Sequence, residues 1–288
     1  TPIYLPGQVG PYSFKKTAHD IKVADGQGFL QPDKENTVFV FTPDDAENAP
    51  GVVFYPGFQL AADNFLYVGE HLASHGFVVL IPTIGDSIIN ADSHVELAER
   101  FSVFLDWLED NAPVDPERLA AGGHSRGGKA AILASLGESR IKATFNLDPV
   151  DTGAGPAGVN AENPSVTPEL MDDLVIPAGF VGAGRGGNGF QPCAPKEDNF
   201  HQYFIAAKKA YAVEYLLKDA GHNDFAQSLS AAIDFFCEKG SNSDETKAVA
   251  KSTMVAFYQV FLNGIEGYRP WVDGEAAPDE AEITVNEP

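Results

Sequence analysis

The chain has 288 residues, of which 44% are hydrophobic and 21% charged, and its formal net charge at pH 7 is −22. A chain of this length can bury a full core without a metal or a disulfide framework. No apolar run approaches the roughly eighteen residues of a transmembrane helix. A strongly acidic surface repels phosphate backbones and anionic lipid headgroups. We therefore expect a globular protein that neither binds nucleic acid nor spans a membrane.

The first half of the chain alternates between short apolar runs and amphipathic stretches. β-branched and aromatic residues, as in 37–41, predict strands, and apolar residues spaced by three or four, as in 95–108, predict helices. The expected strands are 12–24, 36–43, 52–55, 77–82 and 118–123, and the expected helices are 62–74, 95–108 and 126–136.

The same alternation continues in the second half, where the expected strands are 141–147, 174–181 and 211–217 and the expected helices are 224–237 and 246–262. The acidic segment 273–288 is expected to be solvated and poorly ordered. Apolar strands that alternate with helices predict one α/β domain over residues 1–288, with a mostly parallel sheet covered on both faces. Ligands of such a sheet bind at the carboxyl ends of its strands.

One motif carries chemistry. Gly123-His124-Ser125-Arg126-Gly127 lies between an expected strand and an alanine-rich helix. This is the setting of a Gly-x-Ser-x-Gly turn, which lifts the serine hydroxyl above the sheet while the glycines leave room for the neighbouring backbone. The motif predicts an α/β-hydrolase fold, with Ser125 as the nucleophile of a carboxylic-ester hydrolase that needs no metal or cofactor. His124 is expected to pack or to form hydrogen bonds rather than to act as the base.

Serine is a weak nucleophile and needs a base to accept its proton. In this fold the base follows the nucleophile along the chain, and two histidines do so, His201 and His222. His222 comes just after the expected strand 211–217, at the carboxyl edge of the sheet, and we predict it as the base. His201 begins a helical pattern and is expected to be structural or to line the site.

The acid must orient the histidine and stabilise its charged form. Its usual place is the loop after the strand 174–181, but residues 184–190 of that loop carry no carboxylate. Asp148 lies at the tip of the preceding strand, and we predict it as the acid. Asp151 and Asp198 are the alternatives, and the remaining two are then loop or capping carboxylates.

Two backbone donors should surround the developing oxyanion. One is predicted to be the amide of Arg126, directly after the nucleophile, and the other the amide of Phe58, in the turn after an expected strand. We expect Phe58, Gln59, Phe65 and the loop 184–195 to line the substrate pocket. The substrate is expected to be a small-molecule or polymeric ester.

Two cysteines, Cys193 and Cys237, are too few for a disulfide scaffold. They are expected to form one bridge if the protein is exported, and otherwise to remain buried thiols. The sequence begins with Thr1 and no signal-like apolar stretch, which suggests a processed chain. We expect a secreted or periplasmic monomer.

Several segments together resemble a known family. The run 123–129 resembles the lipase motif of chlorophyllases, in which arginine follows the serine. Agreement in the same order extends to 56–60, 73–79, 148–151, 192–195 and 221–224. The resemblance covers roughly residues 51–262 and implies a Ser, Asp and His triad, which falls on Ser125, an aspartate within 148–151, and His222.

The sequence departs from this family at Pro56, where chlorophyllases have a histidine before the glycine. A Pro-Gly-aromatic loop also resembles bacterial cutinase-like polyester hydrolases, although those carry the acid after the later strand. The resemblance therefore implies chlorophyllase-like ester hydrolysis, with polyester hydrolysis as the alternative. A non-catalytic α/β-hydrolase that serves as a binding protein is the alternative from another class, and acyl transfer to an alcohol also remains open.

Overall fold

The computed structural model describes residues 2–23, 34–83, 91–151, 159–188 and 193–288. Within them, the strands form one nine-stranded sheet in the order β1-β2-β4-β3-β5-β6-β7-β8-β9. The pairs from β4 to β8 are parallel, whereas β1–β2, β2–β4 and β8–β9 are antiparallel. The strands are β1 (Phe14–Val23), β2 (Lys34–Pro43), β3 (Ala49–Tyr55), β4 (Val78–Pro82), β5 (Val114–His124), β6 (Ile141–Leu147), β7 (Ala178–Ala183), β8 (Ala212–Leu217) and β9 (Glu282–Asn286).

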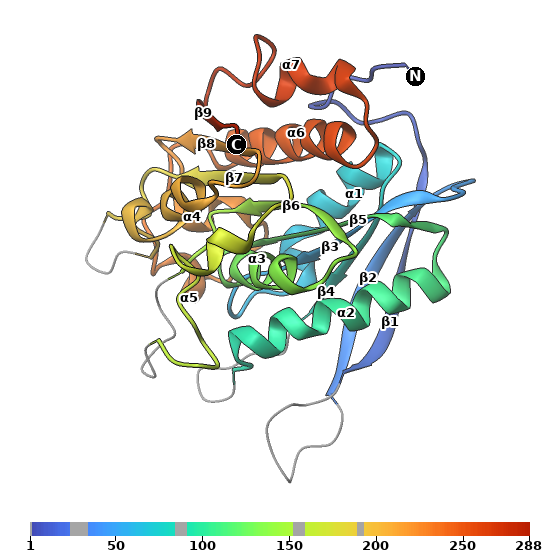
Figure 1. The fold of residues 1–288 in the computed structure, drawn as a ribbon, viewed down its shortest axis with the longest axis horizontal. Coiled ribbons are helices and arrows are strands. Elements are labelled where there is room, and N and C mark those ends of the chain that lie inside the picture. Colours follow the sequence, from blue (N-terminus) through green and yellow to red (C-terminus); the bar gives the residue numbers. More distant parts are fainter. Residues whose placement is uncertain (1, 24–33, 84–90, 152–158, 189–192) are drawn as a thin grey trace.

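Helices cover both faces of this sheet, and α3 and α6 lie on opposite sides of it (Figure 1). Side chains alternate between the faces of a strand, so Tyr55 stacks on Phe101 of α2 while its neighbour Phe54 packs on Phe65 at the other face. The helices are α1 (Leu66–Ser74), α2 (His94–Asn111), α3 (Arg126–Gly137), α4 (Phe200–Ala206), α5 (Ala231–Asp234), α6 (Ser243–Phe261) and α7 (Arg269–Val272). The α/β architecture predicted from the sequence is confirmed.

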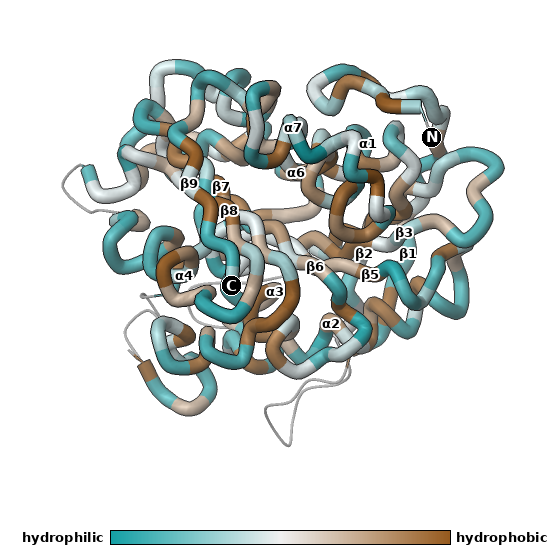
Figure 2. Tube along the Cα trace, turned by 45° about the horizontal axis from the view of Figure 1, so that its top comes forward, coloured by the Kyte–Doolittle hydropathy of each residue, from teal (hydrophilic) through white to brown (hydrophobic). Residues whose placement is uncertain are grey.

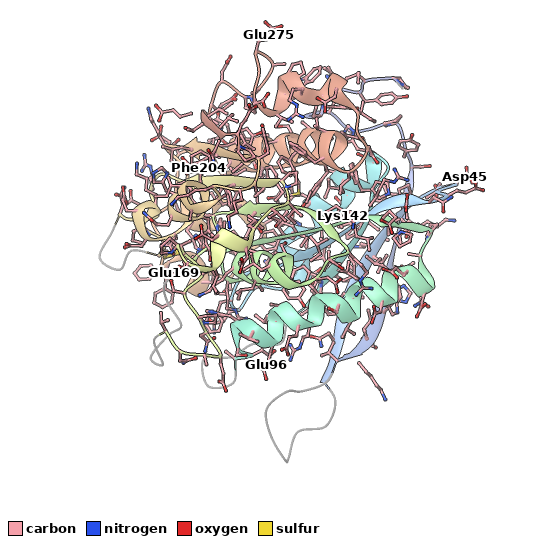
Figure 3. The ribbon with its side chains drawn as sticks, in the orientation of Figure 1. Asp45, Glu96, Lys142, Glu169, Phe204 and Glu275 are labelled. Carbon is pink, nitrogen blue, oxygen red and sulfur yellow. A yellow bond between two sulfur atoms is a disulfide. The ribbon has the colours of Figure 1, made fainter. Side chains whose placement is uncertain are left out.

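Hydrophobic residues concentrate in the central strands and in the helices packed on them, and hydrophilic residues lie in the outer loops (Figure 2). Charged side chains such as Asp45 and Glu275 project outward at the edges of the molecule (Figure 3). The net charge of −22 is therefore carried by a solvated surface around an apolar interior.

The helix expected over 224–237 is wrong. The structure has a short 3-10 turn, η5 (His222–Phe225), and the four-residue helix α5 in its place. Between them Ser228 has a positive φ of 55°, which a helix cannot accommodate. The Asn64 side chain donates to the Gln227 carbonyl (2.7 Å), and the Asn64 carbonyl accepts from the Gln227 amide (2.9 Å). These bonds hold the segment around Gln227 against the turn that contains Asn64, so its backbone groups do not form a helix.

The C-terminal segment 273–288 also differs from the poorly ordered tail that its composition predicts. β9 within it pairs with β8, placing Ile283 opposite Tyr215 and Val285 opposite Val213. The Asn286 side chain donates to the Ala207 carbonyl at 2.7 Å. The physical reason is that β8 would otherwise leave its backbone groups unpaired at the sheet edge. Although the segment is rich in acidic residues, its part 282–286 alternates polar and apolar residues as a strand does.

Candidate active site

Ser125 stands on a sharp turn between β5 and α3. Its φ of +56° and ψ of −123° are strained for a residue with a side chain. The turn needs its flanking glycines: a Cβ at Gly123 would lie 2.4 Å from the backbone of Gly127, and one at Gly127 would lie 2.3 Å from the carbonyl oxygens of Tyr55 and Pro56. The hydroxyl therefore sits at the carboxyl end of the sheet and at the N-terminus of a helix.

His222 approaches this hydroxyl from the loop after β8. Its Nε2 lies 2.9 Å from the Ser125 Oγ, within hydrogen-bond reach. Its Nδ1 lies 2.5 Å from Oδ2 of Asp148. With Nδ1–H donating to the carboxylate, Nε2 carries the lone pair that accepts the serine proton. The three side chains form one continuous hydrogen-bonded chain that is nearly closed to solvent.

Asp148 is held from a second side. Its Oδ1 accepts a hydrogen bond from the backbone amide of Ala183 at 2.9 Å, and its own amide donates to the Val181 carbonyl at 2.7 Å. Both partners belong to β7, the strand that usually carries the acid. Here β7 supplies only backbone groups. They orient the carboxylate of Asp148, which follows the neighbouring strand β6, so that it faces His222.

Asp151 is also buried, but its carboxylate is occupied. It accepts from the amide of Val166 (2.7 Å), the hydroxyl of Ser165 (2.7 Å) and both the amide and the hydroxyl of Thr167. The Lys129 ammonium lies 3.4 Å away. Burial raises the pKa of Asp151, but these hydrogen bonds and the ammonium hold it below its ordinary value. This carboxylate ties loops together beneath the site and does not contact His222.

The remaining aspartate and histidine lie elsewhere. Asp198 is exposed in the 3-10 turn η4 (Lys196–Asp198). His201 pairs through Nδ1 with the buried Glu214 carboxylate at 2.9 Å, and its side chain is partly exposed. Neither side chain is joined to the chain of hydrogen bonds that begins at Ser125.

His124, directly before the nucleophile, supports the base. Its Nε2 donates to the backbone carbonyl of His222 at 2.9 Å, and the two rings lie 4.8 Å apart. Burial is the main cause that lowers the pKa of His124 well below its ordinary value, and the nearby His222 lowers it further. A neutral ring at this position adds no positive charge beside the base. From the sequence we predicted only a packing or hydrogen-bonding role for His124. Its contact with the base was not predictable, because His222 is 98 residues away in the chain.

We expected Phe65 to line the pocket, but it lies in the core instead. It is fully buried, with its ring 5.3 Å from that of His124 and 5.4 Å from that of Phe54. Its place in the core follows from η1 (Ala62–Phe65), which turns its apolar residues toward the sheet. The ring packs against His124, and Phe65 is not among the residues that line the cavity beside Ser125.

The loop predicted to supply the second oxyanion donor passes directly against the nucleophile. A Cβ at Gly57 would lie only 3.1 Å from the Cβ of Ser125. The next two residues, Phe58 and Gln59, are exposed, and Gln59 has a positive φ of 59°. The Arg126 guanidinium lies 4.9 Å from the centre of the Phe58 ring. Burial lowers the pKa of Arg126 to about 10, so it stays charged at neutral pH.

A cavity of about 270 Å³ opens beside Ser125. Its apolar walls are Phe58, Leu60, Ile233 and Phe236, together with the disulfide between Cys193 and Cys237. Cys193 is the part of the expected 184–195 lining that reaches it, and residues 189–192 lie outside the described ranges. The sequence missed Ile233 and Phe236, although two adjacent phenylalanines before a cysteine were a usable signal.

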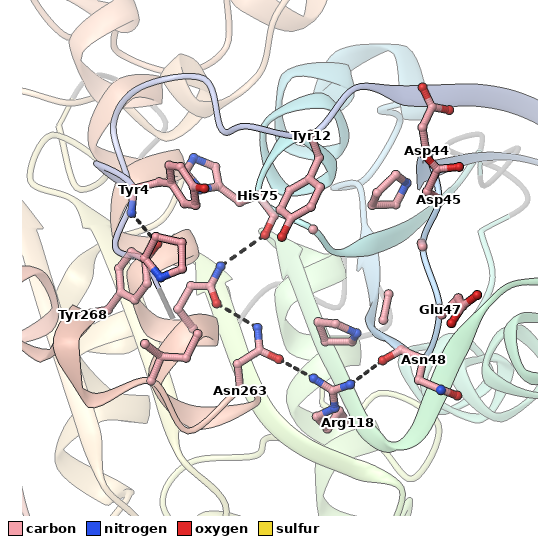
Figure 4. Close-up of a pocket in the computed structure, with 18 residues that line it drawn as sticks. Tyr4, Tyr12, Asp44, Asp45, Glu47, Asn48, His75, Arg118, Asn263 and Tyr268 are labelled. Atoms are coloured by element: carbon pink, nitrogen blue, oxygen red, sulfur yellow. Dashed lines mark hydrogen bonds between the residues drawn. The ribbon is translucent and has the colours of Figure 1, made fainter.

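A larger cavity, of about 460 Å³, is shown in Figure 4 and lies at the amino-terminal ends of β3 and β5. Ser125 stands at the opposite, carboxyl end of β5. Tyr4, Tyr12 and Tyr268 line one part of it, and Arg118 donates to Asn263 at 2.7 Å in another. No member of the hydrogen-bonded chain at Ser125 lines this cavity. The chemistry of the molecule is therefore assigned to the smaller one.

Metal-binding clusters and membrane-spanning helices are both absent from the described part of the chain. No group of three or more His, Cys, Asp or Glu side chains there is arranged to hold a metal ion. Among the helices that the structure describes, none combines the length and the hydrophobicity needed to cross a bilayer.

Comparison with known proteins gives a consistent result. The family model for chlorophyllase matches residues 9–277. Chlorophyllase-1 of Arabidopsis thaliana is 30% identical over 256 residues, which cover 79% of this chain and 76% of that protein. The chloroplastic chlorophyllase-1 of Citrus unshiu is 28% identical over 250 residues, covering 81% of this chain and 74% of that protein. Cutinase 2 of Thermobifida cellulosilytica is 27% identical over 155 residues, covering 52% of this chain and 55% of that protein.

Proposed function

The chain belongs to the chlorophyllase family and is a serine carboxylic-ester hydrolase, and from that premise we propose that Ser125, His222 and Asp148 are its nucleophile, base and acid. The observation that carries the proposal is the hydrogen-bonded chain from the Ser125 hydroxyl through both nitrogens of His222 to the Asp148 carboxylate. Nucleophile, base and orienting acid in this arrangement can activate a serine.

In the acylation step, the Ser125 Oγ attacks the ester carbonyl while His222 Nε2 takes its proton. The imidazolium that forms is stabilised by the Asp148 carboxylate, whose second oxygen is held by the Ala183 amide. The tetrahedral oxyanion lies at the N-terminal end of α3, where the helix dipole favours negative charge. We assign its two donors to the amides of Arg126 and Phe58.

The tetrahedral intermediate collapses to an acyl-enzyme, and His222 returns its proton to the departing alcohol oxygen. Water then attacks the acyl-enzyme with His222 again as the base, which releases the acid and regenerates the Ser125 hydroxyl. His124 keeps the His222 carbonyl in place through its Nε2–H throughout. The cycle uses groups of this chain and water only.

For the substrate, we propose an uncharged ester with an apolar group on one side of the scissile bond. The cavity beside Ser125 is bounded by Phe58, Leu60, Ile233 and Phe236, which favour alkyl or aromatic groups over charged ones. The chlorophyllase relatives give a long alkyl ester as the first candidate. A polyester segment is the second, because the cutinase relatives match half of the chain.

The test is a substrate panel with paired variants. Nitrophenyl esters of graded chain length, chlorophyll and a polyester film are assayed with the native enzyme, Ser125→Ala and Ser135→Ala. Ser135 belongs to the same helix, and its hydroxyl bonds only within it, to the Ala131 carbonyl. Ser125→Ala should lower kcat by at least about three orders of magnitude, and Ser135→Ala should leave it within about twofold. Equal activity of the two variants would overturn the assignment.

A fluorophosphonate probe gives an independent check, because it reacts with an activated serine without requiring the right substrate. Labelling at Ser125 supports the mechanism. Absence of labelling in the folded protein favours the binding-protein alternative. Product analysis with an added alcohol separates hydrolysis from acyl transfer.

We also propose that the protein works as a monomer in a secreted or periplasmic compartment. The support for the location is the Cys193–Cys237 disulfide, since such bonds persist in oxidising compartments. The support for the monomer is that Ser125, His222 and Asp148 come from one chain. Light scattering after gel filtration tests the second point, and fractionation of the source cells tests the first.

A further inference from the structure

The mouth of the cavity beside Ser125 carries exposed aromatic rings. Phe235 is 86% exposed, Phe236 is 62% exposed, and Phe58 on the facing loop is 37% exposed. We call these three residues the aromatic rim. Phe58 and Phe236 line the cavity itself, and the Phe235 ring packs edge-on against Phe236, with ring centres 6.2 Å apart. The rim is thus an apolar surface continuous with the cavity.

The rim is held outward by the surrounding structure. Cys237, directly after Phe236, is bridged to Cys193. On the other side, the Asn223 side chain donates to the Ile233 carbonyl at 3.1 Å, and Asn223 directly follows the base. The segment that bears the two phenylalanines is therefore fastened at both ends, close to His222. Exposed rings on a fastened segment cannot turn into the core, so their apolar surface stays available to a partner.

Two cations near Phe235 and Phe236 form ion pairs. Lys239 forms an ion pair with Asp234, and Arg185 forms ion pairs with Glu238 at 3.3 Å and Asp219 at 3.1 Å. The whole chain carries a net charge of −22. An anionic partner would be repelled by this molecule, and the paired cations beside the rim offer it little compensation. The surface therefore fits an apolar and uncharged partner.

We propose that the aromatic rim docks the enzyme on the surface of an aggregated, uncharged, water-insoluble ester, with the cavity of Ser125 opening toward that surface. Phe235 does not line the cavity and would enter the ester phase. Phe58 and Phe236 line the cavity and would contact the ester where it passes from the surface of the aggregate to Ser125. This inference rests on the proposed function, because the aggregated ester is also the substrate that the enzyme would hydrolyse. Its physical basis is the transfer of exposed rings out of water.

Adsorption is measured apart from catalysis. Ser125→Ala protein is mixed with tributyrin droplets, the droplets are floated by centrifugation, and the free protein is measured. Phe235→Ser in this background should weaken adsorption at least about tenfold, because one strongly exposed ring is lost. The matched control replaces Val9 and Val175, which are 81% and 68% exposed elsewhere, with serine. The control should adsorb as the parent does.

Turnover gives the second readout, with Ser125 intact. Phe235→Ser should slow hydrolysis of the tributyrin emulsion several-fold and leave hydrolysis of dissolved nitrophenyl acetate within about twofold. Phe235→Trp should restore emulsion turnover. Anionic phosphatidylglycerol added to the droplets should weaken adsorption of the parent protein.

Each outcome bears on the docking. Undiminished adsorption of Phe235→Ser, or equal weakening by the valine control, overturns it. Equal slowing on dissolved and emulsified ester also overturns it, because the ring would then act within the cavity. If the parent adsorbs through Phe235 but no ester is hydrolysed, the docking stands and the proposed function fails.

Discussion

The Arg126 guanidinium lies 4.9 Å from the centre of the Phe58 ring, so the residue after the nucleophile packs on the loop that faces it. These are also the two residues to which we assign the oxyanion donors. The arginine is buried and further donates to the Asp92 carbonyl at 3.3 Å. A cation held over an aromatic ring can therefore fix the distance between the two backbone amides.

This contact predicts coupling between the two side chains. A cation–π contact contributes about 0.5–2 kcal/mol, so Arg126→Gln and Phe58→Leu should each lower kcat by about 2- to 30-fold. The double variant should lose little more than either single variant, since both remove one interaction. The measurement is kcat on a dissolved nitrophenyl ester for all four proteins. Unfolding midpoints serve as the control, and fully additive losses would show that the ring contact does not act on the site.

The three candidate acids predict three different phenotypes. Asp148→Asn should lower kcat by about four orders of magnitude, because the amide no longer holds the histidine in its productive form. Asp151→Asn should lower the unfolding midpoint, because its carboxylate joins four backbone and side-chain donors of Ser165, Val166 and Thr167 to Lys129. Asp198→Asn should change neither quantity. Near-native turnover by Asp148→Asn would contradict the proposed triad.

The disulfide is expected to contribute both stability and pocket shape. Cys193 and Cys237 are 44 residues apart, and closing a loop of that length stabilises a protein by up to about 4 kcal/mol in the chain-entropy picture. Replacing both with serine should lower the free energy of unfolding in urea by about 2–4 kcal/mol. It should also raise KM for apolar esters, because the bridge lines the cavity. Thiol titration of the denatured, unreduced native protein should detect no free thiol.

Two buried histidines predict lower stability in mild acid. Burial is the main cause that lowers the pKa values of His71 and His94 from 6.5 to about 4. The unfolded chain takes up these protons near pH 6.5 and the folded chain only near pH 4, so the stabilisation present above pH 6.5 is lost as the pH falls toward 4. At about 1.4 kcal/mol per tenfold difference in proton affinity, each residue accounts for up to about 3 kcal/mol.

Urea unfolding at pH 7 and pH 4.5 measures this loss. His71→Gln should reduce the difference in free energy of unfolding between the two conditions. The control is His201→Gln, because the His201 side chain is partly exposed and lies on a different element. An unchanged pH dependence in His71→Gln would contradict the assignment.

The sequence by itself determined the parts of this protein that depend on local sterics and chain order. Gly123 and Gly127 around Ser125 already specify the strained turn, because any Cβ there would collide with backbone. The alternation of apolar strands and helices specified the sheet, and its direction placed His222 at the same edge as the serine. These features involve neighbours in the chain or a rule about parallel strands, so pattern alone reaches them.

Only the tertiary structure decided which side chains meet. Asp148 and Asp151 are three residues apart in the chain, but their carboxylates have different partners. The Ala183 amide at the end of β7 binds Asp148, whereas Ser165, Val166 and Thr167 bind Asp151. The pairing of β9 with β8, the burial of Phe65 and the exposure of Phe235 likewise depend on contacts between distant segments. Composition and periodicity describe each segment separately, whereas such contacts exist only after the segments have packed.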